Sequence, residues 1–391
     1  MKQYKYLIVG GGMTGDAAVR GIRELDSAGS IGMIGSEAEM PYSRPPLTKG
    51  MWKGRPLEKI WRGTDKFNVE FHLGRMVTRI DSAARRLHDD KGEEYGYEKL
   101  LLATGGSTNR LPFGDEDIIY YRTLQDYYRL RALTEQGQRF LVIGAGFIGS
   151  EIAAALTMIG KQVTMVFRGD SIGDNVYPAD LSKYVNDYYH TKGVELVPGD
   201  EVTGLEKTGN SFKVRTRSGR SLDADGVIAG LGIHPNDELA KSAGIKVDDG
   251  IVVNEHLQTS MTDIYAAGDI ARFPHTTLGK YMRVEHEDNA LKMGKQAGRN
   301  MAAANEAYTH TPMFFSDLFE LGYEAVGELN SKLETVEDWQ DGFQKGVVYY
   351  LADGRVRGVL LWNVWKKVEA ATALMAEAGP FKPQDLKGKI S

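Results

Sequence analysis

The pattern of apolar and polar positions repeats one arrangement twice along the chain. Residues 4–9 form an apolar run that leads into a glycine-rich turn and then into a segment with helical periodicity. Residues 139–143 begin the same succession, and the apolar side chains that follow them recur at the spacing of a buried helix face. Each copy continues into a further apolar run, at residues 31–34 and 163–167. The chain therefore predicts two βαβ units of the kind that binds dinucleotides.

The remaining segments are richer in strand patterns. Alternating positions in residues 212–217 and the apolar runs at residues 100–105 and 226–230 predict additional strands. Near the C-terminus, residues 346–362 predict a hairpin, and a helix through residues 364–375 should follow it. We expect the α/β fold class, with two Rossmann-like nucleotide-binding domains and a C-terminal α+β domain.

Composition limits the chemistry. The 391 residues are 42% hydrophobic and 26% charged, as in globular proteins, and a net charge of −5 gives no general attraction to nucleic acid. The chain has no cysteine, which excludes disulfides, thiolate metal ligands and a cysteine nucleophile. The eight histidines form no close metal-binding pair, so we expect no metal. No targeting segment and no apolar run long enough to span a membrane is found, so we expect a cytoplasmic protein.

The glycine turns carry the first functional signal. They contain Gly10, Gly12 and Gly15 in the first copy, and Gly144, Gly146 and Gly149 in the second. In such a turn the first glycine permits the bend, the second lets a pyrophosphate approach the backbone, and the third lets helix and strand pack closely. One turn alone is weak evidence, but two in the same context favour two nucleotide sites.

The acid that usually holds the ribose distinguishes the two sites. Glu37 lies about 20 residues after the first turn, as expected for an adenosine ribose without a 2′-phosphate. In the second copy the corresponding place holds Arg168, which could pair with a 2′-phosphate, whereas Asp170 could still serve an unphosphorylated ribose. The sequence leaves NADH and NADPH both open.

Longer motifs make a family resemblance specific. They occupy residues 41–49, 102–106, 230–236, 264–269, 283–286 and 359–363. In this order they resemble the FAD-dependent NAD(P)H oxidoreductases related to oxygenase-coupled ferredoxin reductases and to apoptosis-inducing factor, over nearly the whole chain. The resemblance implies an FAD domain of residues 1–113 and 245–310, an NAD(P)H domain of residues 114–244 and a C-terminal domain of residues 311–391.

The same resemblance implies the roles of individual residues. It assigns the first glycine turn and Glu37 to FAD, and the second turn to the nicotinamide nucleotide. Lys49 is expected beside the flavin ring with Glu151 as its ion-pair partner, Phe147 over the ring system, and His286 on the other side of the flavin. A cation beside the ring favours the electron-rich reduced flavin. The other cofactor-binding positions implied are Arg44 at the FAD diphosphate, Asp269 at the ribityl chain or a flavin hydroxyl, and Thr104, Gly105, Gly232, Gly268, Glu285 and Phe315.

Two departures from the family pattern are visible. Phe315 stands where relatives usually have a tryptophan near the flavin, so that ring stacking could survive but the indole N–H donor is lost. Residues 322–346 are short where apoptosis-inducing factor carries a long regulatory insertion. Together with the missing leader, this favours a prokaryotic-type enzyme.

The resemblance implies that hydride passes from NAD(P)H to FAD and that electrons then leave for an external acceptor. Without cysteine, no redox disulfide on this chain can relay them. The leading hypothesis is a ferredoxin or rubredoxin carrier. The alternatives are a slow NAD(P)H oxidase or quinone reductase, with oxygen or quinone as acceptor, and a redox-responsive binding protein whose oligomeric state depends on NADH. The acceptor, the nucleotide preference and the existence of a homodimer stay open.

Overall fold

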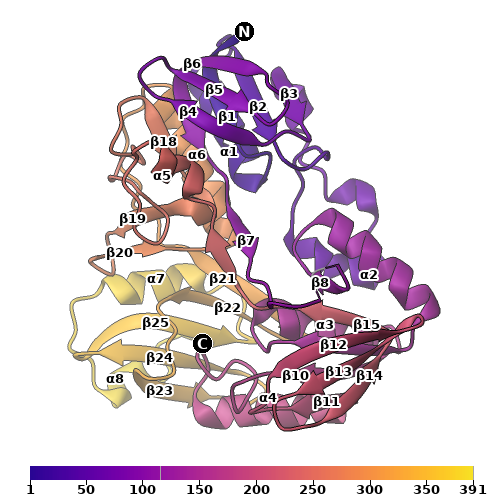
Figure 1. Ribbon diagram of the computed structural model, residues 1–391. Helices are drawn as coiled ribbons and strands as arrows, with labels where there is room; N and C mark the ends of the chain where they lie inside the picture. Colours follow the sequence, from indigo (N-terminus) through magenta and orange to yellow (C-terminus); the bar gives the residue numbers. More distant parts are fainter. Residues whose placement is uncertain (115, 391) are drawn as a thin grey trace. The chain divides into compact units, whose positions relative to one another are not determined.

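The structure is a computed structural model that describes residues 1–114 and 116–390. Its chain forms two compact units, each assembled from separate stretches of sequence (Figure 1). The first unit contains residues 1–43, 56–107 and 234–312, and the second contains residues 44–55, 108–233 and 313–391. The chain passes from one unit to the other at residues 43/44, 55/56, 107/108, 233/234 and 312/313. The short strands β7 (Gly106–Thr108) and β16 (Ile233–Pro235) contain two of these crossings.

The first unit is built on a mixed sheet with strand order β3-β2-β1-β6-β5-β4 and with β18 paired to β6. The strands are β1 (Lys2–Val9), β2 (Ile31–Gly35), β3 (Val69–Leu73), β4 (Val77–Asp81), β5 (Arg86–Asp89), β6 (Glu94–Leu102) and β18 (Ile264–Ala266). Strands β1, β2, β3, β6 and β18 run parallel. The carboxyl ends of parallel strands meet at one edge of a sheet, and ligands usually bind there.

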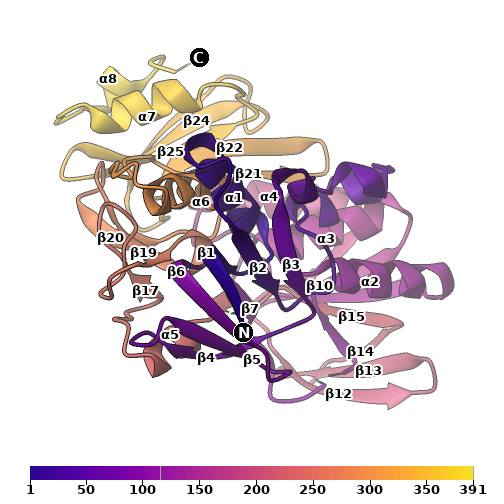
Figure 2. The same ribbon diagram turned by 90° about the horizontal axis from the view of Figure 1, so that it is seen from above.

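Two helices of this unit pack unusually closely. Helices α1 (Met13–Leu25) and α6 (Glu287–Met301) lie side by side in both views (Figure 1, Figure 2). A Cβ on Gly21 of α1 would lie 2.0 Å from the backbone oxygen of Lys295 in α6, and one on Gly298 would lie 2.1 Å from the oxygen of Ala18. Glycine at these positions therefore permits the close crossing.

Short elements complete the first unit. They are η3 (Leu57–Lys59), η4 (Thr64–Phe67), α5 (Glu238–Ser242), β17 (Ile251–Val252), η5 (Gly268–Ile270), β19 (Ala271–His275) and β20 (Lys280–Arg283). Strands β17, β19 and β20 form a small separate sheet.

The second unit repeats the βαβ arrangement. Its parallel sheet has the order β11-β10-β9-β15-β8. The strands are β8 (Ile118–Tyr120), β9 (Arg139–Ile143), β10 (Gln162–Val166), β11 (Val194–Val197) and β15 (Gly226–Ala229), with helices α2 (Leu124–Gln136), α3 (Phe147–Met158) and α4 (Ala179–Thr191). An antiparallel meander follows, of β12 (Val202–Thr208), β13 (Ser211–Thr216) and β14 (Ser221–Ala224). The predicted α/β class with two Rossmann-like βαβ units is confirmed.

The second unit also contains η1 (Pro45–Leu47), η2 (Gly50–Lys53) and a five-stranded antiparallel C-terminal sheet of order β21-β22-β25-β24-β23. Its strands are β21 (Met313–Leu318), β22 (Leu321–Gly327), β23 (Glu334–Trp339), β24 (Gly346–Ala352) and β25 (Arg355–Trp362), followed by α7 (Val368–Ala376) and α8 (Pro383–Leu386). The predicted hairpin is β24–β25.

The predicted helix of residues 364–375 was wrong at its start, because α7 begins only at Val368. Asn363 and Lys366 adopt left-handed backbone conformations, with φ of 50° and 62°. A right-handed helix cannot pass through such residues, so the helix starts beyond them.

Candidate functional site

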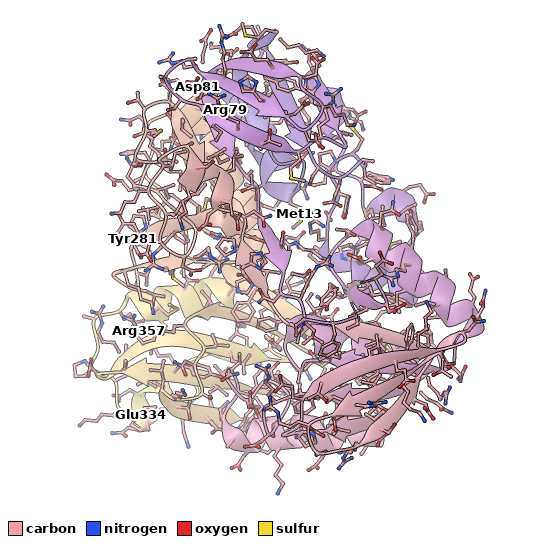
Figure 3. All side chains as sticks on the ribbon, viewed as in Figure 1. Met13, Arg79, Asp81, Tyr281, Glu334 and Arg357 are labelled. Carbon is pink, nitrogen blue, oxygen red and sulfur yellow. The ribbon has the colours of Figure 1, made fainter. Side chains whose placement is uncertain are left out.

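The first glycine turn joins β1 to α1, whose first residue Met13 is labelled in Figure 3. Gly10 has φ of +130°, and a Cβ there would lie 2.1 Å from the backbone oxygen of Ala103, just beyond β6. A Cβ on Gly15 would lie 2.2 Å from the oxygen of Gly10, whereas around Gly12 nothing lies within 4 Å. The outer glycines therefore close the turn, and the middle one leaves room for a phosphate group at the start of a helix.

The second glycine turn has the same geometry. Gly144 has φ of +99°, and its Cβ would lie 2.4 Å from the oxygen of Gly230, just beyond β15. A Cβ on Gly149 would lie 2.1 Å from the oxygen of Gly144, and nothing lies within 4 Å of one on Gly146. Each unit thus carries a cradle that fits a dinucleotide pyrophosphate.

Glu37 follows the end of β2 in the first unit, where a ribose-binding acid is expected. The hydroxyl of Tyr42 donates a hydrogen bond of 2.5 Å to its Oε2. The backbone oxygen of Glu37 accepts from the N–H of Gly74 at 3.0 Å. Both contacts fix the acid at the carboxyl edge of the sheet.

Thr104 and Gly105 follow β6 at the same edge. The Thr104 hydroxyl donates to the backbone oxygen of Asn236 at 3.0 Å, and Asn236 Nδ2 donates to the backbone oxygen of Thr104 at 2.9 Å. Gly105 has φ of +64°, which suits glycine at this turn. Asn236 was not among the predicted site residues.

Gly268 and Asp269 form the turn after β18. Gly268 has φ of +80°, and a Cβ there would lie 2.2 Å from Thr14 Oγ1. Arg283 Nη1 donates to the backbone oxygen of Asp269 at 3.1 Å and to Glu285 Oε1 at 2.5 Å. Arg283, which the site prediction also omitted, therefore links two predicted site residues.

His286 is the N-cap residue of α6. Burial lowers its pKa to about 4, although the negative charges of Asp269 and Asp288 act in the opposite direction. The imidazole is therefore neutral at pH 7 and can donate through one nitrogen and accept through the other.

Lys49 and Glu151 form an ion pair inside the second unit. Lys49 Nζ lies 2.6 Å from Glu151 Oε2, and the two side chains are only 13% and 3% exposed. The hydroxyl of Thr48 also donates to Oε2, and that of Ser316 donates to Oε1, both at 2.6 Å. Glu151 lies on α3 and Ser316 on β21. Three donors from two separate segments, residues 48–49 and Ser316, therefore fix one buried carboxylate.

Two aromatic residues beside this cluster are partly exposed. Phe147, the first residue of α3, is 39% exposed and contacts Phe314 edge to face, with 5.5 Å between ring centroids. Phe315 is 37% exposed, and Lys49 Nζ lies 5.2 Å from the centroid of its ring. Phe315 is thus in cation–π contact with the buried ion pair.

The remaining predicted residues of the second unit have other partners. Arg44 Nη1 donates to the backbone oxygen of Arg122 at 3.0 Å. The backbone oxygen of Gly232 accepts from the N–H of Asn109 at 3.0 Å. Arg168 forms an ion pair with Glu201.

The predicted site residues divide between the units. The first unit holds Gly10, Gly12, Gly15, Glu37, Thr104, Gly105, Gly268, Asp269, Glu285 and His286. The second holds Arg44, Lys49, Gly144, Gly146, Phe147, Gly149, Glu151, Arg168, Gly232 and Phe315.

Sequence reasoning did not find Thr48 and Ser316 as partners of Glu151. Thr48 precedes Lys49 within the motif of residues 41–49, and Ser316 directly follows Phe315. A single sequence shows neither that two distant segments converge on the Glu151 carboxylate nor which hydroxyls they supply.

Within residues 1–114 and 116–390, no group of three or more histidines and acids is placed to hold a metal ion. Among the helices of the same residues, none is long and apolar enough to cross a membrane.

Comparisons with known proteins match the chain over nearly its whole length. The family model described as pyridine nucleotide-disulphide oxidoreductase matches residues 4–294. The model described as apoptosis-inducing factor, mitochondrion-associated, C-term matches residues 297–341 and 337–377. The chain is 32% identical to apoptosis-inducing factor 1 of Dictyostelium discoideum, covering 96% of this chain and 79% of that protein.

Bacterial reductases are similar as well. The putidaredoxin reductase of Pseudomonas putida is 32% identical over 82% of this chain and 79% of its own length. Among solved structures, the reductase in the covalent putidaredoxin reductase–putidaredoxin complex is 29% identical, with a TM-score of 0.91 over 99% of this chain and 96% of that chain. The ferredoxin reductase for the CYP199A2 system from Rhodopseudomonas palustris is 28% identical, with a TM-score of 0.86 over 93% of this chain and 91% of that chain. The resemblance inferred from the motifs is confirmed.

Proposed function

Because the chain belongs to the pyridine nucleotide-disulphide oxidoreductase family, whose members use a flavin and a pyridine nucleotide, we propose that it is an FAD-dependent NAD(P)H oxidoreductase serving a ferredoxin- or rubredoxin-type carrier. The observation that carries this proposal is the likeness to putidaredoxin reductase, with a TM-score of 0.91 over 99% of the chain. The two glycine cradles support it, since each leaves its middle glycine open.

We assign FAD to residues 1–113 and 245–310, the nicotinamide nucleotide to residues 114–244, and the flank of the redox centre to residues 311–391. The first glycine turn and Glu37 would then hold FAD, and the second glycine turn the nicotinamide nucleotide. When bound, the nicotinamide supplies a hydride to the flavin, which can release its electrons one at a time.

In this proposal Lys49 provides the positive charge beside the flavin ring. Its ion pair with Glu151 is already formed, and the hydroxyls of Thr48 and Ser316 hold that carboxylate in place. A preorganised cation–carboxylate pair needs little rearrangement when charge develops nearby. Phe147 and Phe315, each more than a third exposed, would exclude water from the reacting rings.

His286 contributes a neutral donor and acceptor on the other side of the flavin. Because its pKa is lowered to about 4, it adds no positive charge at pH 7. Lys49 is then the cation assigned to the ring, and Arg44 the cation assigned to the FAD diphosphate.

The acceptor must accept electrons directly from the flavin. The chain contains no cysteine, so none of its own residues can act as a disulfide relay. A one-electron protein carrier or a quinone meets this condition, and the likeness to carrier reductases favours the protein carrier.

A slow NAD(P)H oxidase or quinone reductase is the second candidate. It is favoured by the match of the C-terminal residues to the apoptosis-inducing factor model. In that case oxygen or a quinone would replace the protein carrier. A redox-responsive binding protein that changes its oligomeric state with NADH would show a mass change in sedimentation velocity when NADH is added.

The proposal is tested with the purified holoenzyme. Its extracted flavin should be FAD, and anaerobic stopped-flow absorbance should show flavin reduction by NADH or NADPH. Reduction of a [2Fe–2S] ferredoxin or of rubredoxin should then proceed at least tenfold faster than oxygen consumption without a carrier. Carrier turnover no faster than this oxygen leak would contradict the leading function and favour the oxidase.

A further inference from the structure

The end of β10 lacks the acid that normally recognises a ribose. β10 ends at Val166, and Phe167, Arg168 and Gly169 follow. In a dinucleotide-binding βαβ unit this place carries a carboxylate that hydrogen-bonds the ribose hydroxyls. Neither Arg168 nor Gly169 can supply one.

A carboxylate from farther along the chain fills the empty space. A Cβ on Gly169 would lie 2.0 Å from Asp174 Oδ2 and 2.9 Å from its Cγ. The Asp174 carboxylate therefore lies where a side chain at position 169 would begin. The absence of a side chain at Gly169 makes this approach possible.

The loop that carries Asp174 is also fastened to the second glycine turn. The N–H of Gly173 donates to the backbone oxygen of Ala145 at 3.4 Å, and the N–H of Ile172 donates to Asn186 Oδ1 at 2.9 Å. Gly173 has φ of +68°, and a Cβ there would lie 2.3 Å from the ring of Tyr177. Asp174 is thereby held between the pyrophosphate cradle and the end of β10, which is where the adenosine ribose of a dinucleotide lies.

The arginines near Asp174 have an ion-pair partner, whereas the Asp174 carboxylate has none among the residues that the structure describes. Arg168 and Arg217 both bind Glu201, one to each carboxylate oxygen, at 2.5 Å. Within residues 1–114 and 116–390, the half-buried Asp174 carboxylate has no hydrogen-bond or ion-pair partner. Glu201 thus holds both arginines and offsets one of their two positive charges, while the carboxylate beside the cradle can still accept hydrogen bonds.

We propose that Asp174 is the acid that binds the adenosine ribose of the nicotinamide nucleotide, and that the site therefore selects NADH over NADPH. Its oxygens accept hydrogen bonds from the 2′- and 3′-hydroxyls and repel a 2′-phosphate. This inference rests on the proposed function, which assigns the second glycine turn to this nucleotide. It decides in favour of NADH, whereas Arg168 and Asp170 in the sequence left both NADH and NADPH open.

The test is isothermal titration calorimetry of the oxidised holoenzyme with NAD⁺, NADP⁺, ADP-ribose and 2′-phospho-ADP-ribose. Wild type should bind each unphosphorylated ligand at least tenfold more tightly than its phosphorylated counterpart. Asp174→Asn should weaken binding of NAD⁺ and ADP-ribose about tenfold or more, because a charged hydrogen bond is lost, and should leave the phosphorylated ligands unchanged or tighter. Asp180→Asn changes an exposed acid on α4 and is the matched control. It should leave the affinities for all four ligands as they are in wild type.

A second variant separates ribose recognition from a structural role. Asp174→Ala combined with Gly169→Glu places a carboxylate beside the space that the Asp174 carboxylate occupies in wild type and should restore the preference for NAD⁺ that Asp174→Ala alone removes. A merely structural role would not be rescued, and circular dichroism would show whether each variant folds.

Several results would overturn the inference. One is that wild type binds NADP⁺ more tightly than NAD⁺ and that Arg168→Ala abolishes this difference. Another is that Asp174→Asn keeps the wild-type preference for NAD⁺ over NADP⁺. Loss of the preference in Asp170→Asn instead would assign the role to that acid. If wild type bound none of the four ligands, the proposed function would fail together with this inference, whereas a failure of Asp174→Asn alone leaves the proposed function standing.

Discussion

At the scale of single residues, the buried carboxylate of Asp16 shows how several converging donors hold a charge inside the fold. Asp16, fully buried in the first turn of α1, accepts from Arg62 Nε at 2.6 Å, from Thr64 Oγ1 at 2.7 Å and from Arg20 Nε at 3.0 Å. Burial alone would raise the pKa of Asp16, but these hydrogen bonds hold it below its usual value. The carboxylate therefore stabilises the fold in its charged form.

We predict that Asp16→Asn lowers the free energy of unfolding by about 3 kcal/mol, because two arginines lose their buried counter-charge. Urea unfolding at pH 7 would measure this, with the exposed Asp65→Asn as control. Because the pKa is lower in the folded state, the contribution is fully present above the usual aspartate pKa and is lost as the pH falls through the folded value. Wild type should therefore lose more stability than the variant between pH 5 and pH 3, and parallel curves would contradict this.

The Lys49–Glu151 pair gives a prediction on electron transfer. Lys49→Met removes the charge that we assign to the flavin ring and should slow flavin reduction by NAD(P)H about tenfold or more, because that cation favours the reduced flavin. Stopped-flow absorbance at saturating nucleotide measures the rate. Lys53→Met, which changes an exposed lysine of η2, is the control. Equal rates in wild type and Lys49→Met would remove Lys49 from the redox centre.

A site residue could be predicted from the sequence where its role follows from its local segment, but not where the role depends on contacts with distant residues. The glycines of both turns follow from backbone requirements that the sequence itself displays. Lys49 and Glu151 are 102 positions apart, and only the family resemblance paired them. Ser316 and Asp174 were not predicted as site residues. Their roles depend on contacts formed when the chain folds back on itself, and a local sequence pattern does not encode these contacts.

At the scale of elements, helix α1 meets α6 at a position that only glycine allows. A Cβ on Gly21 would lie 2.0 Å from the Lys295 oxygen, which is backbone and cannot move aside cheaply. We predict that Gly21→Ala destabilises the protein by about 2 kcal/mol or more, because the two helices must separate. Thermal unfolding, together with the retained fraction of FAD, measures the effect.

Gly204→Ala is the matched control, since nothing lies within 4 Å of a Cβ at that position and its φ is not left-handed. It should stay within about 0.5 kcal/mol of wild type. Similar melting temperatures for the two variants would show that the helix crossing tolerates a methyl group.

The repeated strand–turn–helix pattern was sufficient to predict both βαβ units, since buried parallel strands read as continuous apolar runs and each run is followed by a glycine turn and a helical pattern. Boundaries set by single backbone conformations were not predictable. The start of α7 depends on left-handed conformations at Asn363 and Lys366, and neither residue type requires one. Short strands such as β7 and β16, with three residues each, carry too little pattern to be recognised.

At the scale of the whole molecule, the composition determines how electrons can leave. The family takes its name from disulphide chemistry, but this chain has no cysteine anywhere in its 391 residues. Enzymes that relay electrons through a cysteine pair expose a nucleophilic thiolate once the pair is reduced, and an alkylating reagent then blocks them. This chain offers no such target.

We therefore predict that iodoacetamide leaves carrier reduction unchanged, even when the enzyme has first been reduced with NAD(P)H under anaerobic conditions. Steady-state turnover before and after alkylation measures this, with glutathione reductase, treated identically, as the positive control. The carrier is added only after excess reagent has been removed, so that its own cysteines are protected. Inactivation only of the pre-reduced enzyme would mean that a nucleophile other than cysteine takes part in electron transfer, which would contradict direct passage from the flavin to the acceptor.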